Sequence, residues 1–150
     1  MDIIVGNSAA ILRNKYISDY IDVNSQHYID NVATLKDYDD GACYTGYLWE
    51  CFDNSSIVDE ETARTMIMNV QTQIYVMWDI HSCKKIYIEN YWKYPKDAVI
   101  CVNASEFVEY ENTFPEDIYV FNDDFSWSIT LTHEYIDNKR ICLVPTKTNT

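Results

Sequence analysis

The densest group of possible metal-binding side chains lies near residue 80. Asp79, His81 and Cys83 are separated from each other by one residue, so a continuous β-strand would project all three from the same face. Each of these side chains can bind zinc or iron. A turn expected directly after His81 would break this alternation, and a hydrogen-bonded cluster at a sheet edge is the main alternative. The geometry therefore predicts either a metal site or such a cluster.

His133 and Glu134 are further candidates for chemistry, because either one could supply a fourth metal ligand. The pair begins like the H-E-x-x-H motif of metalloproteases, but the second histidine is missing and the segment alternates like a strand, which excludes that motif. In this alternation His133 shares a face with Ile129 and Leu131. We therefore expect a hydrogen-bonded core histidine rather than a catalytic one.

Other catalytic motifs are missing from the chain. The sequence has no G-x-G-x-x-G, no G-x-x-x-x-G-K-[ST], no G-x-S-x-G and no C-x-x-C pattern, which excludes the enzymes that these motifs define. A cysteine nucleophile at Cys83 assisted by His81 stays open. The enzymatic alternative is a metal-dependent enzyme with a site around Asp79, His81 and His133, and we expect no organic cofactor.

The charge of the chain is the strongest indication of its partners. Twenty-four acidic residues against eleven Lys and Arg give a formal net charge of −13. Such a surface repels nucleic-acid phosphates and attracts basic proteins, or it only maintains solubility. Two segments, 37–61 and 106–124, contain acidic residues and no basic one. We therefore expect two acidic patches and a basic protein as partner, with no nucleic acid bound.

Aromatic residues are frequent enough to suggest a protein interface. The chain has thirteen tyrosines and four tryptophans, and these residue types anchor protein contacts. The alternative is that they fill the core and expose only their polar tips. The predicted contact residues for a basic partner are Asp37, Asp39, Asp40, Tyr91, Trp92, Tyr94, Glu109 and Glu111.

Cysteine usage and hydropathy indicate a cytoplasmic protein without a membrane span. The five cysteines are odd in number and irregularly spaced, and the N-terminal residues lack the pattern of a secretory signal. The longest uncharged stretch, residues 65–78, has fourteen residues, fewer than the roughly 20 that cross a bilayer. Free thiols in a reducing cytoplasm are the simplest interpretation.

Hydrophobic periodicity predicts helices first and strands later. A helix capped by Asn7 or Ser8 would carry Leu12, Tyr16 and Tyr20 on one face. A second helix is expected after Asn24 or Ser25, a loop over 37–46, and a third helix that begins at Asp59. Residues 47–52 fit a strand or the start of a helix equally well.

From Gln73 onward the apolar residues alternate, which is typical of strands. Strands are expected over 74–80, 86–88, 98–102, 118–121, 127–132 and 140–144, with a short helix or turn over 104–112. Residues 1–150 are thus predicted to form one α+β domain, with N-terminal helices packed on a mainly antiparallel sheet from the C-terminal half.

The segments Tyr75–His81 and Pro115–Glu134 resemble small bacterial immunity proteins of the kind found beside secreted toxins. This resemblance covers the C-terminal half of the chain and leaves out residues 1–45. It implies a cytoplasmic, non-enzymatic inhibitor that binds and neutralises a toxin domain, often a basic nuclease.

Overall fold

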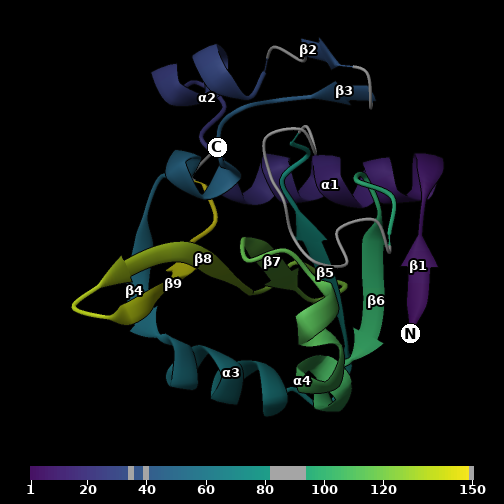
Figure 1. Cartoon of the computed structure of the whole chain (residues 1–150), viewed down its shortest axis with the longest axis vertical. Helices are drawn as coiled ribbons and strands as arrows, with labels where there is room; N and C mark the ends of the chain where they lie inside the picture. The colour runs from purple at the N-terminus through teal and green to yellow at the C-terminus, as the bar shows by residue number, and fades with distance from the viewer. Residues whose placement is uncertain (34–35, 39–40, 82–93, 149–150) are drawn as a thin grey trace.

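The strands of the chain form one large antiparallel sheet with helices on both faces (Figure 1). The computed structural model describes residues 1–33, 36–38, 41–81 and 94–148. Within these residues the sheet has seven strands in the order β1-β6-β5-β7-β8-β9-β4. The predicted α+β class is confirmed, with helices at the N-terminus and strands mainly in the C-terminal half.

The strands of the large sheet are β1 (Asp2–Ile4), β4 (Ser55–Asp59), β5 (Gln73–Trp78), β6 (Val99–Asn103), β7 (Ile118–Phe121), β8 (Ser128–Ile136) and β9 (Lys139–Pro145). A separate two-stranded sheet consists of β2 (Lys36–Tyr38) and β3 (Gly41–Cys43). The helices are α1 (Gly6–Tyr20), α2 (Gln26–Asn31), α3 (Glu60–Met68) and α4 (Phe107–Tyr110), with short 3-10 turns η1 (Leu48–Cys51), η3 (Ala104–Glu106) and η4 (Glu111–Thr113).

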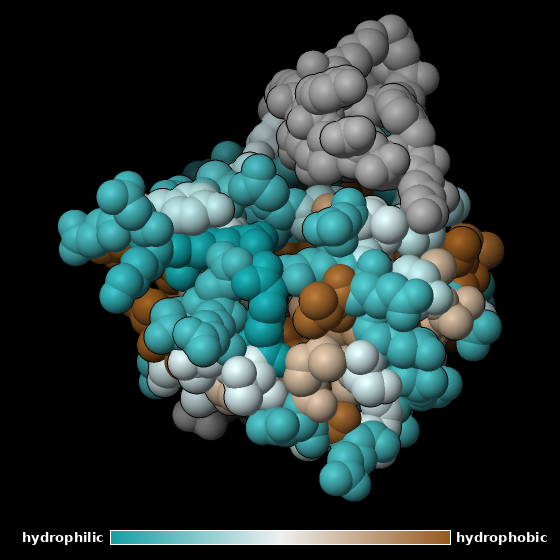
Figure 2. Space-filling view, turned by 60° about the horizontal axis from the view of Figure 1, so that its bottom comes forward, coloured by the Kyte–Doolittle hydropathy of each residue, from teal (hydrophilic) through white to brown (hydrophobic). Residues whose placement is uncertain are grey.

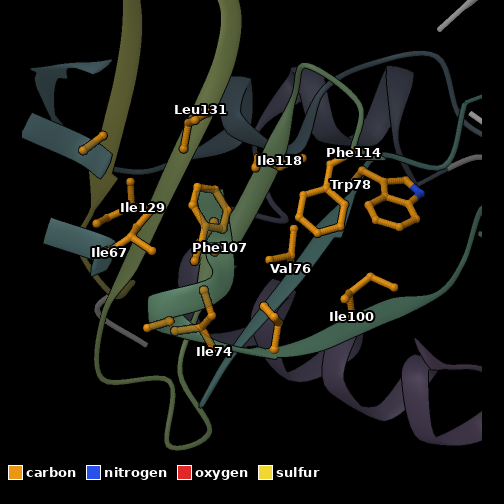
Figure 3. Packing of buried hydrophobic residues seen from close by; sticks show 14 of the residues in the cluster. Ile67, Ile74, Val76, Trp78, Ile100, Phe107, Phe114, Ile118, Ile129 and Leu131 are labelled. Carbon is orange, nitrogen blue, oxygen red and sulfur yellow. The ribbon is translucent and has the colours of Figure 1, made fainter. Parts of the chain in front are cut away.

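Two hydrophobic layers hold the helices against the sheet. In Figure 1, α1 crosses one face while α3 and α4 lie at the other. The layer under α3 and α4 is built around Ile67 and Phe107, which pack on strand residues such as Val76 (Figure 3). The layer under α1 contains Tyr16 and Tyr20 with Met77 and other side chains. Because helices cover both faces, β5 is buried on both sides from Val76 to Trp78, rather than on one apolar face as its alternation predicted.

The outer surface beside α3 and α4 is mostly hydrophilic, with isolated apolar side chains (Figure 2). Met66, Met68 and Val108 are exposed apolar residues on these two helices. None of the helices in the described parts of the chain is both long and apolar enough to span a membrane.

Local side-chain chemistry explains where two of the helices begin. The Ser25 hydroxyl accepts a hydrogen bond from Tyr28 N at 3.2 Å, and Asp59 Oδ1 accepts one from Thr62 N at 2.7 Å. Both N-caps are as predicted. The predicted caps of α1 are wrong, because the helix begins at Gly6 and its N-cap is Val5, which has no capping side chain.

Three other local predictions differ from the structure. The expected loop over 37–46 contains the β2–β3 pair, residues 48–51 form the 3-10 turn η1, and β4 was not predicted at all. The strand expected over 86–88 lies outside the described residues. In the edge strand β4 only Ser55 and Val58 are partly buried and the other side chains are exposed; such short, polar strands give a weak periodic signal.

The packing of Phe107 in the layer under α3 and α4 predicts how much stability its truncation costs. Phe107→Ala should lower the free energy of unfolding by about 3–5 kcal/mol, because it leaves a cavity where the ring is fully buried. Val108→Ala is the matched control, since Val108 is 50% exposed and its truncation should change stability by less than about 0.5 kcal/mol. Urea unfolding measures both, and equal costs would contradict this packing.

Candidate functional site

A buried carboxylate lies directly after the last residue of β5. Alternation turns Trp78 towards α3 and α4 and Asp79 towards the face that α1 covers. Asp79 is 5% exposed. Its Oδ1 accepts hydrogen bonds from the Tyr44 hydroxyl and from Leu48 N, both at 2.9 Å, and its Oδ2 accepts one from the Tyr119 hydroxyl at 2.8 Å. Two donors from the segment 44–48 and one from β7 therefore meet at one side chain.

Two opposing effects set the pKa of Asp79. Burial disfavours the charged form and raises the pKa from its ordinary value of 3.8 to about 6, although His81 and the three donors favour the carboxylate. The same burial raises the pKa of Tyr44 and Tyr119 well above the ordinary value. Both tyrosines therefore remain neutral hydrogen-bond donors at neutral pH.

The Arg13 side chain of α1 bonds to backbone carbonyls at the end of β5 and just before β6, beside the Asp79 carboxylate. Its guanidinium donates to the carbonyls of Trp78 at 2.7 Å and Ala98 at 3.1 Å, and also to those of Lys96 and Asp97. Burial lowers the pKa of Arg13, and the nearby Tyr44 and Asp79 oppose that shift. Helix α1, which carries Arg13, is thus attached to the sheet through buried polar groups.

The segment after Tyr44 comes close to α2 and needs a glycine there. Gly46 N donates to Asn31 O at 3.1 Å, and a Cβ at position 46 would lie 2.9 Å from Asn31 Cβ and from His27 Nε2. The His81 Nε2–H donates to Gly46 O at 2.6 Å. The chain from Tyr44 to Leu48 is therefore held at both ends and in its middle.

The predicted metal ligands are used in other ways in the structure. Both Asp79 oxygens accept hydrogen bonds, and His81 Nε2 bonds to a carbonyl. The ring of Tyr47 contacts the imidazoles of His81 and His133, at centroid distances of 4.8 and 4.9 Å. Among the residues that the structure describes, no three His, Cys, Asp or Glu side chains form a possible metal site. Cys83 lies outside those residues.

A second cluster, nearer the surface, surrounds Trp49 in η1. The Trp49 indole Nε1 donates to Asp117 Oδ1 at 3.0 Å, and the Trp49 backbone N donates to the Tyr119 hydroxyl at 2.9 Å. His133 Nδ1 donates to Asp117 Oδ2 at 2.9 Å. Because Tyr119 also bonds to Asp79, the surface cluster is connected to the buried carboxylate.

Carboxylates surround this aromatic cluster. Glu50, Glu116 and Glu134 are exposed, and they act electrostatically on Tyr47 or His133 together with Asp117. Burial and these acids raise the pKa of Tyr47 to about 12. Burial opposes protonation of His133, but the hydrogen bond to Asp117 and the neighbouring acids outweigh it and raise the pKa of His133. We call this surface the Trp49 face; it consists of Tyr47, Trp49, Glu50, Glu116, Asp117, His133 and Glu134.

His133 is not the core histidine that the alternation predicted. A register shift in the β8–β9 pairing between Leu131 and Tyr135 interrupts the strict alternation of β8. The His133 side chain is 36% exposed and contacts the rings of Tyr47 and Trp49. The irregularity therefore moves this imidazole from the expected core position into the Trp49 face.

The predicted contact residues do not form one surface in the described parts of the chain. The prediction that Tyr94 contacts a partner is corrected, because Tyr94 is 5% exposed and packs on Trp78 and Phe114 in the core. Glu111 is 15% exposed and paired with Arg64, whereas Glu109 is exposed on α4. Asp37 lies in β2, with only its backbone described. Asp39, Asp40, Tyr91 and Trp92 lie outside the described residues.

Sequence reasoning did not single out Tyr47, Trp49 or Asp117, although one signal pointed to Asp117. The strands predicted over 118–121 and 127–132 are joined by a short turn, and the observed register pairs Ile118 with Leu131. That hairpin places Asp117 next to the residues that precede His133.

Comparison of the chain with protein families, with characterised proteins and with solved structures found no match.

The buried carboxylate predicts a pH-dependent stability. Asp79 binds its proton more tightly in the folded protein, so the stability that it contributes is largest below about pH 4 and is lost as the pH rises through about 6. Asp79→Asn should therefore destabilise the protein by about 1–3 kcal/mol near pH 5, and by less at pH 7. Urea unfolding of both proteins at each pH measures this, with Asp123→Asn as an exposed control. A cost that does not change with pH would contradict the raised pKa.

The Asp117–His133 pair predicts a measurable change in titration. Asp117→Asn should lower the pKa of His133, because it removes the carboxylate that favours the imidazolium while the burial remains. Glu134→Gln should lower it less, since Glu134 Oε1 lies 3.6 Å from His133 Nε2 and is exposed. NMR titration of the imidazole protons measures both variants; an unchanged His133 pKa in Asp117→Asn would show that the pair does not form.

Proposed function

We propose that the protein is a non-enzymatic binding module that docks its Trp49 face on a basic protein and inhibits it, as an immunity-type protein inhibits a toxin or nuclease domain. The observation that carries the proposal is the placement of Tyr47, Trp49 and His133 among four carboxylates on the surface of a chain with net charge −13. Aromatic anchors of this kind contribute much of the affinity of protein interfaces.

The fixed orientation of Trp49 supports this proposal. Its backbone N and its indole Nε1 both donate hydrogen bonds, to Tyr119 and to Asp117. An aromatic side chain that is already ordered in the free protein loses little conformational entropy on binding. The aromatic surface is therefore pre-organised for a contact, and its buried connection to Asp79 maintains it.

The surrounding acids support a basic partner rather than an apolar one. Glu50, Glu116 and Glu134 are exposed, and their charges would steer lysine and arginine side chains towards the rings of Tyr47 and Trp49. Arginine and lysine also interact favourably with aromatic faces. The metal-dependent alternative finds no support in the described residues, because the polar atoms of Asp79 and His81 already bond to protein groups.

Matched charge variants test the proposal. The tagged protein is used for capture from native lysate at low salt, and the captured basic protein is then purified for kinetic measurements. The triple variant Glu50→Gln, Glu116→Gln, Glu134→Gln should slow association about tenfold or more and reduce its salt dependence. The control triple Asp2→Asn, Asp123→Asn, Asp124→Asn changes the net charge equally at exposed positions in β1 and in the turn at the end of β7 opposite to Asp117.

The two triples distinguish a specific face from a general charge effect. The control triple should slow association by less than about threefold, because distant charges are screened at physiological salt. Equal effects of both triples would remove the Trp49 face from the proposal. If no basic protein is captured in stoichiometric amount, the proposed function fails.

A further inference from the structure

The outer edge of β4 is open along most of the strand. In the order of the sheet β4 is the last strand, and in the described residues it pairs only with β9. Its register places Ser55 opposite Pro145 and Ile57 opposite Leu143. The opposite edge strand, β1, has only three residues, whereas β4 has five.

The hydrogen-bonding phase shows which backbone groups point outward. Thr146 N donates to Asn54 O at 3.0 Å, so the pair 54–146 is a hydrogen-bonded one, and such pairs alternate along an antiparallel ladder. Ser56 and Val58 therefore bond to β9, while the N–H and C=O groups of Ser55 and Ile57 point away from the sheet. Pro145, which has no N–H, stands opposite Ser55 as this phase requires.

The side chains of this edge also favour a docked strand. Ile57 is 67% exposed, and the partly buried Leu143 lies beside it on the same face of the sheet. Natural edge strands are usually protected by lysine, proline, a bulge or short length. The sequence of β4, Ser-Ser-Ile-Val-Asp, contains no lysine or proline and its pairing with β9 has no bulge. Its one charged side chain, Asp59, is bonded to Thr62 N at the start of α3. An apolar side chain next to free backbone groups is the arrangement that strand addition uses.

The charges around β4 select the occupant. Asp53 precedes the strand, and Asp59 and Glu61 follow its apolar part; all three are exposed. Lys139 of β9 acts electrostatically on Asp59 and offsets part of this acidic charge. A second copy of this chain would bring another net charge of −13 and its own aspartates to the same edge, which is unfavourable. Asp59 lies two residues from Ile57 in β4 and therefore shares its face of the sheet. A segment with an apolar residue opposite Ile57 and a lysine or arginine two residues away from it complements both side chains.

We propose that β4 is a docking edge that accepts an extended, lysine- or arginine-containing segment of another protein as an eighth strand of the sheet. The contact consists of backbone hydrogen bonds to Ser55 and Ile57, with an apolar side chain of the segment packed on Ile57. These residues are not part of the Trp49 face, so this inference does not depend on the proposed function.

A peptide titration tests the docking edge. The probe is the acetylated and amidated peptide Thr-Lys-Thr-Val-Thr-Lys-Thr, added to the ¹⁵N-labelled protein and followed by NMR. The amide signals of Ser55 and Ile57 should shift, and their hydrogen exchange should slow about tenfold at saturation. The amides of Ser56 and Val58 should exchange as before, because they already bond to β9.

Two controls separate strand pairing from charge attraction. The same peptide with its valine N-methylated cannot complete the ladder and should bind at least about tenfold more weakly. Ile57→Thr should weaken binding about fivefold, since it removes apolar contact and retains a β-branched side chain. Ile136→Thr is the matched control, because Ile136 is 58% exposed at the other end of the β8–β9 pair, and it should leave binding unchanged.

Each other outcome would overturn the inference. Equal binding of the N-methylated peptide would show that only charge attracts the probe. If hydrogen exchange at the Ser55 and Ile57 amides is slow without peptide, and slows further as the protein concentration rises, the occupant is a second copy of the chain. An absence of shifts at both residues would show that the edge accepts no strand.

Discussion

The carboxylate of Asp79 receives hydrogen bonds from the Tyr44 hydroxyl, the Leu48 amide and the Tyr119 hydroxyl in a site with almost no solvent contact. Tyr44 lies just after β3 and Leu48 begins η1 a few residues later, whereas Tyr119 in β7 is far from both in the sequence. Removal of the carboxylate would leave all three without an acceptor, and buried unpaired polar groups are costly. The position of η1 on the sheet therefore depends on this one side chain, and so does the direction of Trp49.

Most of the fold follows from patterns that are visible in the sequence. The alternation in β5, β7 and β8 and the caps at Ser25 and Asp59 were sufficient to predict these three strands, two helix starts and the α+β class. The short edge strand β4 and the turn η1 were not predictable in this way, because their side chains are mostly polar or aromatic and they are positioned by contacts with distant segments. The register shift that exposes His133 also has no local signal.

The candidate site was harder to predict than the fold, for a physical reason. Asp79 and His81 were singled out as possible metal ligands, but the groups that bond to them come from other elements. A carboxylate and an imidazole two residues apart fit a metal site and a hydrogen-bonded network equally well. Long-range contacts decide between the two, and here Tyr44, Tyr119 and Gly46 provide them. The same contacts place Trp49 beside Asp117, so a buried polar network supports the aromatic and acidic Trp49 face.

The most direct test of this account is an NMR pH titration of the Asp79 side-chain carboxyl carbon, recorded together with the amide signals of Leu48 and Trp49. The account predicts a midpoint near pH 6, because burial disfavours the charged form, and the same midpoint at both amides, because Leu48 bonds to the carboxylate and Trp49 bonds to Tyr119. A midpoint near the ordinary value of 3.8, with no matching change at Leu48 or Trp49, would contradict the claim that this carboxylate positions the Trp49 face.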